Sequence, residues 1–177
     1  MPRNIVSLIG FIILVLGGGT AIGLYTLPGE WYASLAKPPF NPPNWIFGPV
    51  WSILYVMIAV AGWRLWTNHR DSLSMKIWWV ALALNFIWSP IFFGAQQLAA
   101  ALVVILGLLA LIYAFIAKTW NVDRLAAWLF VPYAAWVSFA TLLNASQSSH
   151  ELTFSPTFQG CTPCSGSSFC CGPPPRC

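Results

Sequence analysis

Residues 98–117, LAAALVVILGLLALIYAFIA, form an unbroken apolar stretch without one charged side chain, and Lys118 follows directly. An α-helix rises 1.5 Å per residue, so about 20 apolar residues are needed to cross a hydrocarbon core of about 30 Å. The stretch has this length, and we therefore expect it to form a transmembrane helix.

The same kind of segment recurs along the chain, and the sequence predicts an all-α, polytopic membrane protein built as a bundle of five transmembrane helices. The segments lack the alternating pattern of barrel strands, and a helix satisfies its backbone polar groups within the segment. Residues 1–145 are predicted to form this transmembrane domain. The predicted spans are residues 5–27, 44–66, 76–93, 98–118 and 124–144.

The composition excludes most other classes of protein. Of the 177 residues only 7% are charged, whereas a soluble domain carries about 25%. The mean hydropathy of +0.72 is also too high for a soluble or a disordered chain. A net charge of +4 is too small to indicate nucleic-acid binding. The two His residues have no metal-ligand spacing with Cys, Asp or Glu, so no metal site is predicted.

The last segment, residues 146–177, differs in composition from the rest. It is rich in Cys, Pro and Ser, and it holds all 5 Cys of the chain. One interpretation is a redox or metal-binding knot that includes a CxxC motif at Cys161 and Cys164. The other, which we favour because the Cys have no His nearby, is a disordered or non-native tail.

The basic residues predict the orientation of the bundle. One end carries most of the Lys and Arg, and the end with the first loop and the C-terminus carries few. Cytoplasmic loops are enriched in Lys and Arg, so we expect the N-terminus in the cytoplasm and the C-terminus outside, in a bacterial membrane. The basic end holds Arg3, Arg64, Arg70, Lys76, Lys118 and Arg124, and the other end holds Lys37 and Arg176.

Polar side chains inside a membrane are expensive, so each one is a candidate site. Asn85 lies in the middle of the third span, with Trp88 and Ser89 on the same helical face. Pro90 removes a backbone hydrogen bond and is expected to kink the helix around a cavity. The alternative is that Asn85 only bonds a neighbouring helix as a packing contact.

Aromatic residues add to this candidate site. Trp51 and Tyr55 share a face of the second span, and Tyr133 and Trp136 share a face of the fifth, with the small Ala140 one turn on. Other Trp residues near span ends are typical of an interfacial belt. These are Trp31, Trp45, Trp66, Trp78, Trp79, Trp120 and Trp128.

A cavity lined by indoles, a phenol and an amide favours a flat, mostly apolar ligand such as a porphyrin or a sterol. Transport of a charged solute would require ionisable groups in the interior of the spans, and the sequence places Lys and Arg only at the span ends. Gly19 and Gly23 form a GxxxG motif, which permits close helix packing either within the bundle or between subunits.

Three stretches together resemble the translocator protein / tryptophan-rich sensory protein family, also called the peripheral-type benzodiazepine receptor family, in its bacterial form. They are WYASLAKPPFNPPNWIFGPVW at residues 31–51, LNFIWSPIFFG at 84–94 and VPYAAWVSFATLLN at 131–144. Their order and spacing match the family over roughly residues 5–144.

The resemblance implies a membrane receptor or sensor that binds porphyrins, namely protoporphyrin IX and haem, as ligands and needs no cofactor. It also implies isoquinoline carboxamide drugs as ligands, sterol in many members, and a homodimer in the lipid bilayer. Its ligand-binding positions fall on Trp51, Tyr55, Asn85, Trp88, Trp136 and Ala140, and Trp31 belongs to the first loop above the family's pocket.

Two further functions follow from the resemblance as alternatives. One is a light-dependent porphyrin-degrading enzyme in which Trp51 and Trp136 act as redox-active catalytic residues. The other is a tetrapyrrole or sterol transporter. Two departures from the family concern ligand binding: Pro39 replaces a frequent Trp, and the Tyr and Arg of the mammalian cholesterol segment are absent after Asn144.

Overall fold

The computed structural model describes residues 2–26 and 44–154 of the chain, and all of its regular elements are helical. Among these residues are five helical segments long and apolar enough to cross a membrane, which confirms the predicted fold class. The first span consists of α1 (Pro2–Ile12), the π-helical η1 (Ile13–Gly17) and α2 (Gly18–Tyr25). The others are α4 (Asn44–Asn68), α5 (Leu73–Ser89) continued by the π-helical η2 (Pro90–Gly94), α6 (Leu98–Thr119) and α7 (Arg124–Phe154).

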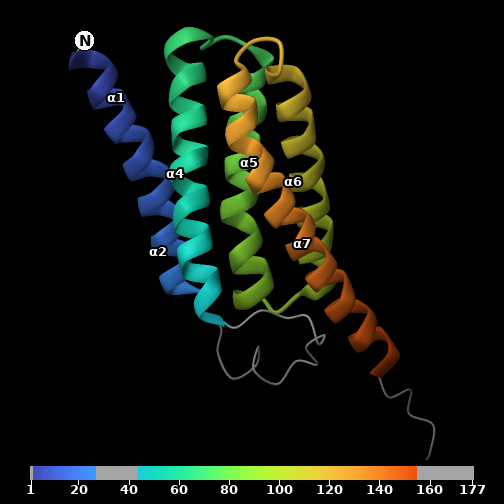
Figure 1. Cartoon of the computed structure of the whole chain (residues 1–177). Coiled ribbons are helices and arrows are strands. Elements are labelled where there is room, and N and C mark those ends of the chain that lie inside the picture. Colours follow the sequence, from blue (N-terminus) through green and yellow to red (C-terminus); the bar gives the residue numbers. More distant parts are fainter. Residues whose placement is uncertain (1, 27–43, 155–177) are drawn as a thin grey trace, which may run out of the picture.

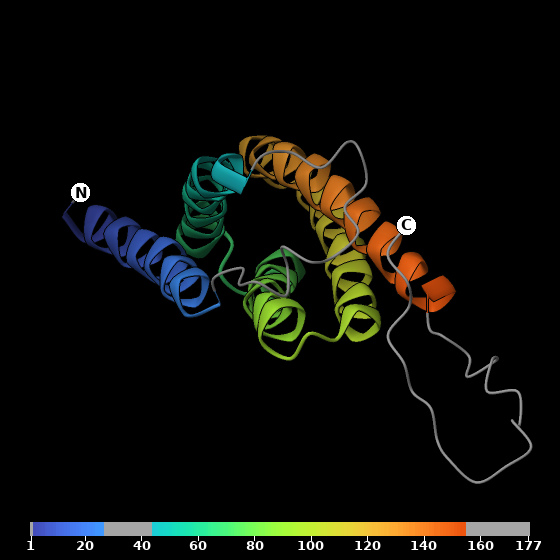
Figure 2. The same cartoon turned by 90° about the horizontal axis from the view of Figure 1, so that it is seen from below.

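The helices run alternately up and down, and sequential ones pack side by side (Figure 1). Seen along the bundle, the first span, α4, α7, α6 and α5 follow one another in a ring (Figure 2). A continuous core of buried apolar side chains joins α4, α5, α6 and α7, and Phe115 stacks on Phe130 with ring centroids 3.9 Å apart.

The last helix is longer than predicted. The expected span ended at residue 144, whereas α7 continues to Phe154. Asn144, Gln147 and Ser148 are buried, and the Ser148 hydroxyl donates to the Asn144 carbonyl at 2.9 Å. Hydropathy falls here because the side chains are polar, but they are packed, so the predicted tail boundary at Ser146 is wrong for these first residues.

Trp78 corrects the prediction of an interfacial belt residue. Its side chain is fully buried, and its indole N–H donates to the Ile58 carbonyl at 3.0 Å. Gly62, one turn further along α4, makes room for the ring, because a Cβ at that position would overlap the indole. By contrast Trp45, Trp79, Trp120 and Trp128 are exposed on the bundle surface.

An ion pair fixes α4 against the start of α7. Arg64 Nε and Nη2 donate to the two carboxylate oxygens of Asp123 at 2.8 and 3.1 Å. The same carboxylate caps α7 by accepting from the backbone N–H groups of Leu125 and Ala126. Burial raises the pKa of the Asp123 carboxyl, but the hydrogen bonds from Arg64 and the backbone lower it by more, so the pKa lies below its ordinary value.

Gly19 of the GxxxG motif packs inside the bundle. A Cβ at Gly19 would overlap the ring of Tyr55 on α4, whereas a Cβ at Gly23 would meet no atom of the part of the chain that the structure describes within 4 Å. The close approach at Gly19 is therefore between helices of one chain, as the internal alternative predicted.

Candidate ligand-binding site

A cavity of about 410 Å³ lies between α2, α4, α5 and α7, near the end of the bundle where α2 finishes and α4 begins. We call this end the pocket end. All the predicted ligand-binding residues in the described part of the chain line the cavity, and Trp31 lies outside the described residues. The predicted residues that line it are Trp51, Tyr55, Asn85, Trp88, Trp136 and Ala140.

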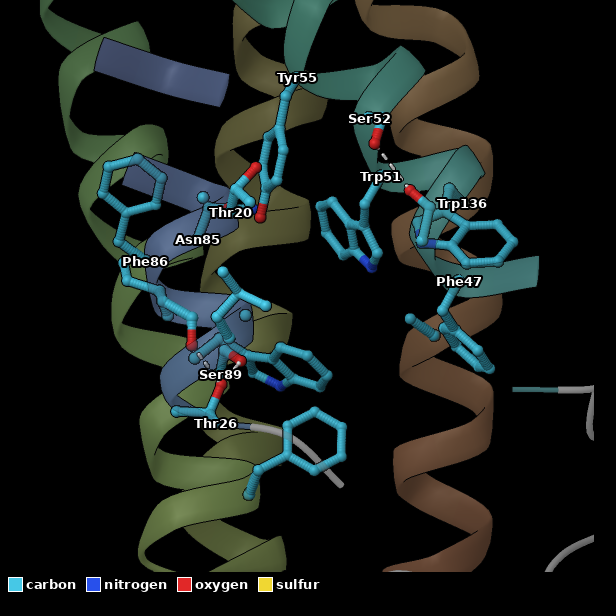
Figure 3. Close-up of a pocket in the computed structure, with 18 residues that line it drawn as sticks. Thr20, Thr26, Phe47, Trp51, Ser52, Tyr55, Asn85, Phe86, Ser89 and Trp136 are labelled. Carbon is cyan, nitrogen blue, oxygen red and sulfur yellow. Dashed lines mark hydrogen bonds between the residues drawn. The ribbon is translucent and has the colours of Figure 1, made fainter. Parts of the chain in front are cut away.

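One wall of the cavity is aromatic and comes from α4 and α7. The ring centroids of Trp51 and Tyr55 lie 5.2 Å apart, which follows from their separation by one helical turn. Trp136 of α7 meets Phe47 edge to face at 5.7 Å. Figure 3 shows the Trp51 indole projecting between Tyr55 and the Trp136–Phe47 pair. These flat faces can stack on a planar ligand.

The opposite wall comes from α5 and carries the buried amide. Asn85 Nδ2 donates to the Tyr133 hydroxyl of α7 at 2.8 Å, so the packing contact considered for Asn85 does exist. This bond uses only the amide nitrogen, and Asn85 Oδ1 has no partner. The residue therefore holds α5 against α7 and also leaves an acceptor at the cavity.

Three buried polar atoms of the lining residues lack hydrogen-bond partners: Asn85 Oδ1 and the indole Nε1 atoms of Trp88 and Trp136. An unpaired buried donor or acceptor costs about 1–3 kcal/mol, and native proteins keep few of them. All three belong to residues that line one cavity, whose described lining carries no charge, and together they are two N–H donors and one carbonyl acceptor.

At Pro90 the helix changes from α-helical to π-helical geometry, whereas the sequence predicted a kink there. Since Pro90 has no N–H, the ladder shifts to the wider spacing of η2, in which the Ala95 N–H donates to the Pro90 carbonyl at 2.8 Å. Phe93 of this turn lines the cavity. Such π-helical turns occur frequently at functional sites.

Sequence reasoning missed the contact that closes the seam between α2 and α5. The hydroxyls of Thr26 and Ser89 lie 2.8 Å apart in a hydrogen bond, and both residues line the cavity (Figure 3). Ser89 was noted only as sharing a face with Asn85. The residues are far apart in the sequence, so no local pattern indicates their pairing.

The lining residues define what the cavity can do chemically. None of them carries a charge, and among the described residues no three His, Cys, Asp or Glu side chains come close enough to hold a metal ion. The described lining residues include no side chain suited to acid–base catalysis at neutral pH, and their chemistry is that of stacking and a few hydrogen bonds.

Fold and site together define a multi-pass α-helical membrane protein with an uncharged, aromatic pocket between its helices. The model of the TspO/MBR family matches residues 11–149, and the chain belongs to that family. The match passes beyond Asn144, in agreement with the longer α7.

Several relatives from different kingdoms cover most of the chain. Protein CrtK of Rhodobacter capsulatus is 38% identical over 140 residues, which are 77% of this chain and 86% of the relative. Tryptophan-rich protein TspO of Archaeoglobus fulgidus is 38% identical over 145 residues, 80% of this chain and 94% of the relative. The human translocator protein is 37% identical over 134 residues, 71% of this chain and 79% of the relative.

Proposed function

We propose that this protein is a membrane receptor or sensor for porphyrins, with protoporphyrin IX and haem as ligands, held in the cavity between α2, α4, α5 and α7. The observation that carries the proposal is that Asn85, Trp88 and Trp136, each with an unpaired buried polar atom, line one cavity together with further aromatic side chains and with no charged residue among those described. A tetrapyrrole has a flat face for the indoles, N–H groups for Asn85 Oδ1 and oxygen acceptors for the indole N–H groups.

We propose that haem binds in the same cavity, with contacts to its iron in place of contacts to porphyrin N–H groups. His, Cys, Met and Tyr are the usual axial ligands of haem iron, and Tyr55 is the one described lining residue of these types. A phenol in an apolar cavity is a poor ligand until it is ionised. We therefore expect the porphyrin plane, rather than the iron, to supply most of the affinity.

Isoquinoline carboxamides meet the same requirements, since they combine a fused aromatic ring with an amide carbonyl. A sterol offers a hydroxyl but no aromatic face, so we expect it to bind more weakly than the planar ligands. We also propose that the protein is a homodimer in a bacterial membrane, with the N-terminus in the cytoplasm.

A titration of the purified protein with protoporphyrin IX tests the proposal. Ligand binding should quench tryptophan fluorescence saturably. Replacing Trp51 and Trp136 together by Phe removes stacking area and two indole N–H groups from residues that line the cavity, which should weaken binding by about 1–3 kcal/mol, or about 5- to 150-fold. An unchanged affinity in the double variant would contradict the site assignment.

A light-dependent porphyrin-degrading enzyme is the second candidate, favoured because Trp51 and Trp136 line one cavity. An indole next to a photoexcited porphyrin can donate an electron to it, so that the indole is oxidised and the porphyrin reduced. Illumination of the bound porphyrin distinguishes the candidates: equal bleaching rates in the wild type and the double Phe variant would exclude catalysis by these residues. Porphyrin flux into liposomes would instead indicate transport.

A further inference from the structure

The cavity reaches the flank of the bundle on the side between α2 and α4. Thr20 and Gly23 of α2 and Gly48 and Ser52 of α4 line the cavity, and all of them are also exposed on the outside of the protein. A residue that faces both the cavity and the exterior marks a rim, so these four residues outline an opening.

The two helices diverge toward the pocket end. Deeper in the bundle the first span and α4 are in contact, because the Trp63 indole donates to the Ser7 hydroxyl at 3.1 Å and Tyr55 packs directly on Gly19. Beyond Tyr55, at Gly23 and Gly48, an added Cβ would meet no atom of the described residues within 4 Å. Seen from the pocket end, the ends of α2 and α4 stand apart (Figure 2).

The other side of α2 is closed. The Thr26–Ser89 hydrogen bond joins α2 to α5, and a Cβ at Gly18 would lie 3.0 Å from the Phe86 ring of α5. The opening is therefore confined to the α2–α4 side, since the first span is packed against α5 on its other side.

The opening lies within the membrane-spanning part of both helices. The spans run over Ile5–Tyr25 and Trp45–Asn68. At 1.5 Å per residue, Thr20 and Ser52 lie about 8–10 Å inside the end of the span. Because the span itself crosses the hydrocarbon core, this depth lies in the acyl-chain region, below the head groups.

We propose that the gap bounded by Thr20, Gly23, Gly48 and Ser52 is a lateral portal through which a planar, amphiphilic ligand dissolved in the bilayer reaches the cavity. The proposal rests on the proposed function, since it assumes that the cavity holds such a ligand. Ser52 Oγ donates to the Gly48 carbonyl at 2.9 Å, so its oxygen stays available as an acceptor for the polar edge of a passing ligand.

Filling the rim tests the portal by kinetics. In Gly23→Leu and Gly48→Leu, one on each side of the gap, a side chain projects into open space. Gly10→Leu is the matched control, because a Cβ at Gly10 of α1 also meets nothing within 4 Å and that residue does not line the cavity. Stopped-flow fluorescence quenching by protoporphyrin IX in lipid nanodiscs gives the association and dissociation rates.

Both rim variants should slow association and dissociation by a similar factor, on the order of tenfold, with a much smaller change in Kd, while Gly10→Leu keeps the wild-type rates. Saturable binding with wild-type rates in both rim variants would overturn the portal alone. Absence of saturable binding to the wild-type protein would overturn the proposed function and the portal with it.

Discussion

The unpaired indole N–H of Trp136 predicts opposite effects of one substitution on stability and on binding. Trp136→Phe removes a buried donor that has no partner, so it removes a penalty of about 1–3 kcal/mol from the ligand-free protein. The matched variant Trp78→Phe removes an N–H that is bonded to the Ile58 carbonyl, and it loses about 0.5–1.5 kcal/mol of stabilisation. Both variants lose ring area, and that loss is greater at the fully buried Trp78.

Trp136→Phe should therefore be the more stable of the two variants, with a free energy of unfolding at least about 1.5 kcal/mol higher than that of Trp78→Phe. Binding should respond in the reverse order. Loss of one ligand hydrogen bond should raise the Kd for protoporphyrin IX by about 2- to 12-fold in Trp136→Phe and leave it unchanged in Trp78→Phe, whose ring is outside the cavity. Unfolding in detergent followed by circular dichroism, with fluorescence titrations on the same samples, measures both quantities.

The reasoning is refuted if the two variants are equally destabilised and Trp136→Phe binds as tightly as the wild type. That result would mean that the Trp136 N–H has a partner in the ligand-free protein and does not serve the ligand.

The other predictions concern helix packing and the ion pair. Gly19→Ala should destabilise the fold by about 1–3 kcal/mol, because the added methyl group displaces the Tyr55 ring, and it should also weaken porphyrin binding. Gly23→Ala should change the stability by less than about 0.5 kcal/mol. Thermal unfolding of both variants measures the difference. Asp123→Asn keeps a capping residue but removes the charge partner of Arg64. It should lower the free energy of unfolding by only about 1 kcal/mol, because the Arg64 side chain is 31% exposed and water weakens the ion pair. A variant as stable as the wild type would show that the ion pair is fully screened. The pKa of Asp123 is lowered in the folded protein, so its stabilising contribution is complete above the ordinary pKa of an Asp carboxyl and is lost as the pH falls through the lowered pKa. The difference in stability between wild type and Asp123→Asn should therefore persist at pH 5 to 7 and vanish in strong acid.

Much of the fold and of the candidate site can be predicted from the sequence because the membrane restricts the possibilities. Uncharged segments of about 20 residues are expected to cross the membrane as helices. Polar side chains in the middle of such a helix are costly, so each one indicates a packing contact or a binding site. Asn85, Trp51 and Trp136 stood out on these grounds alone. The structure adds that Asn85 performs two tasks, with its nitrogen bonding Tyr133 and its oxygen left unpaired.

The features that sequence reasoning missed depend on contacts between distant residues. Trp78 lies near a span end, yet it is buried because Gly62 of another helix leaves space for its ring. The pairs Arg64–Asp123 and Thr26–Ser89 likewise join separate helices. No periodicity within one segment encodes such pairings.

The length of α7 was underestimated for a different reason. Hydropathy falls after residue 144 because Gln147 and Ser148 are polar, but both side chains are buried within the protein. Hydropathy measures how well a side chain is accommodated by lipid, whereas these two side chains are packed against protein.

The most direct test of the porphyrin site is to observe the indole N–H groups themselves. With all 11 Trp residues labelled with ¹⁵N, and the signals assigned by single Trp→Phe variants, the indole resonances can be followed by NMR as protoporphyrin IX is added. The Trp88 and Trp136 resonances should shift saturably with one ligand per chain, as their unpaired N–H groups acquire acceptors, while the Trp78 resonance stays in place. Saturable binding that leaves the Trp88 and Trp136 resonances unmoved would contradict the proposed site.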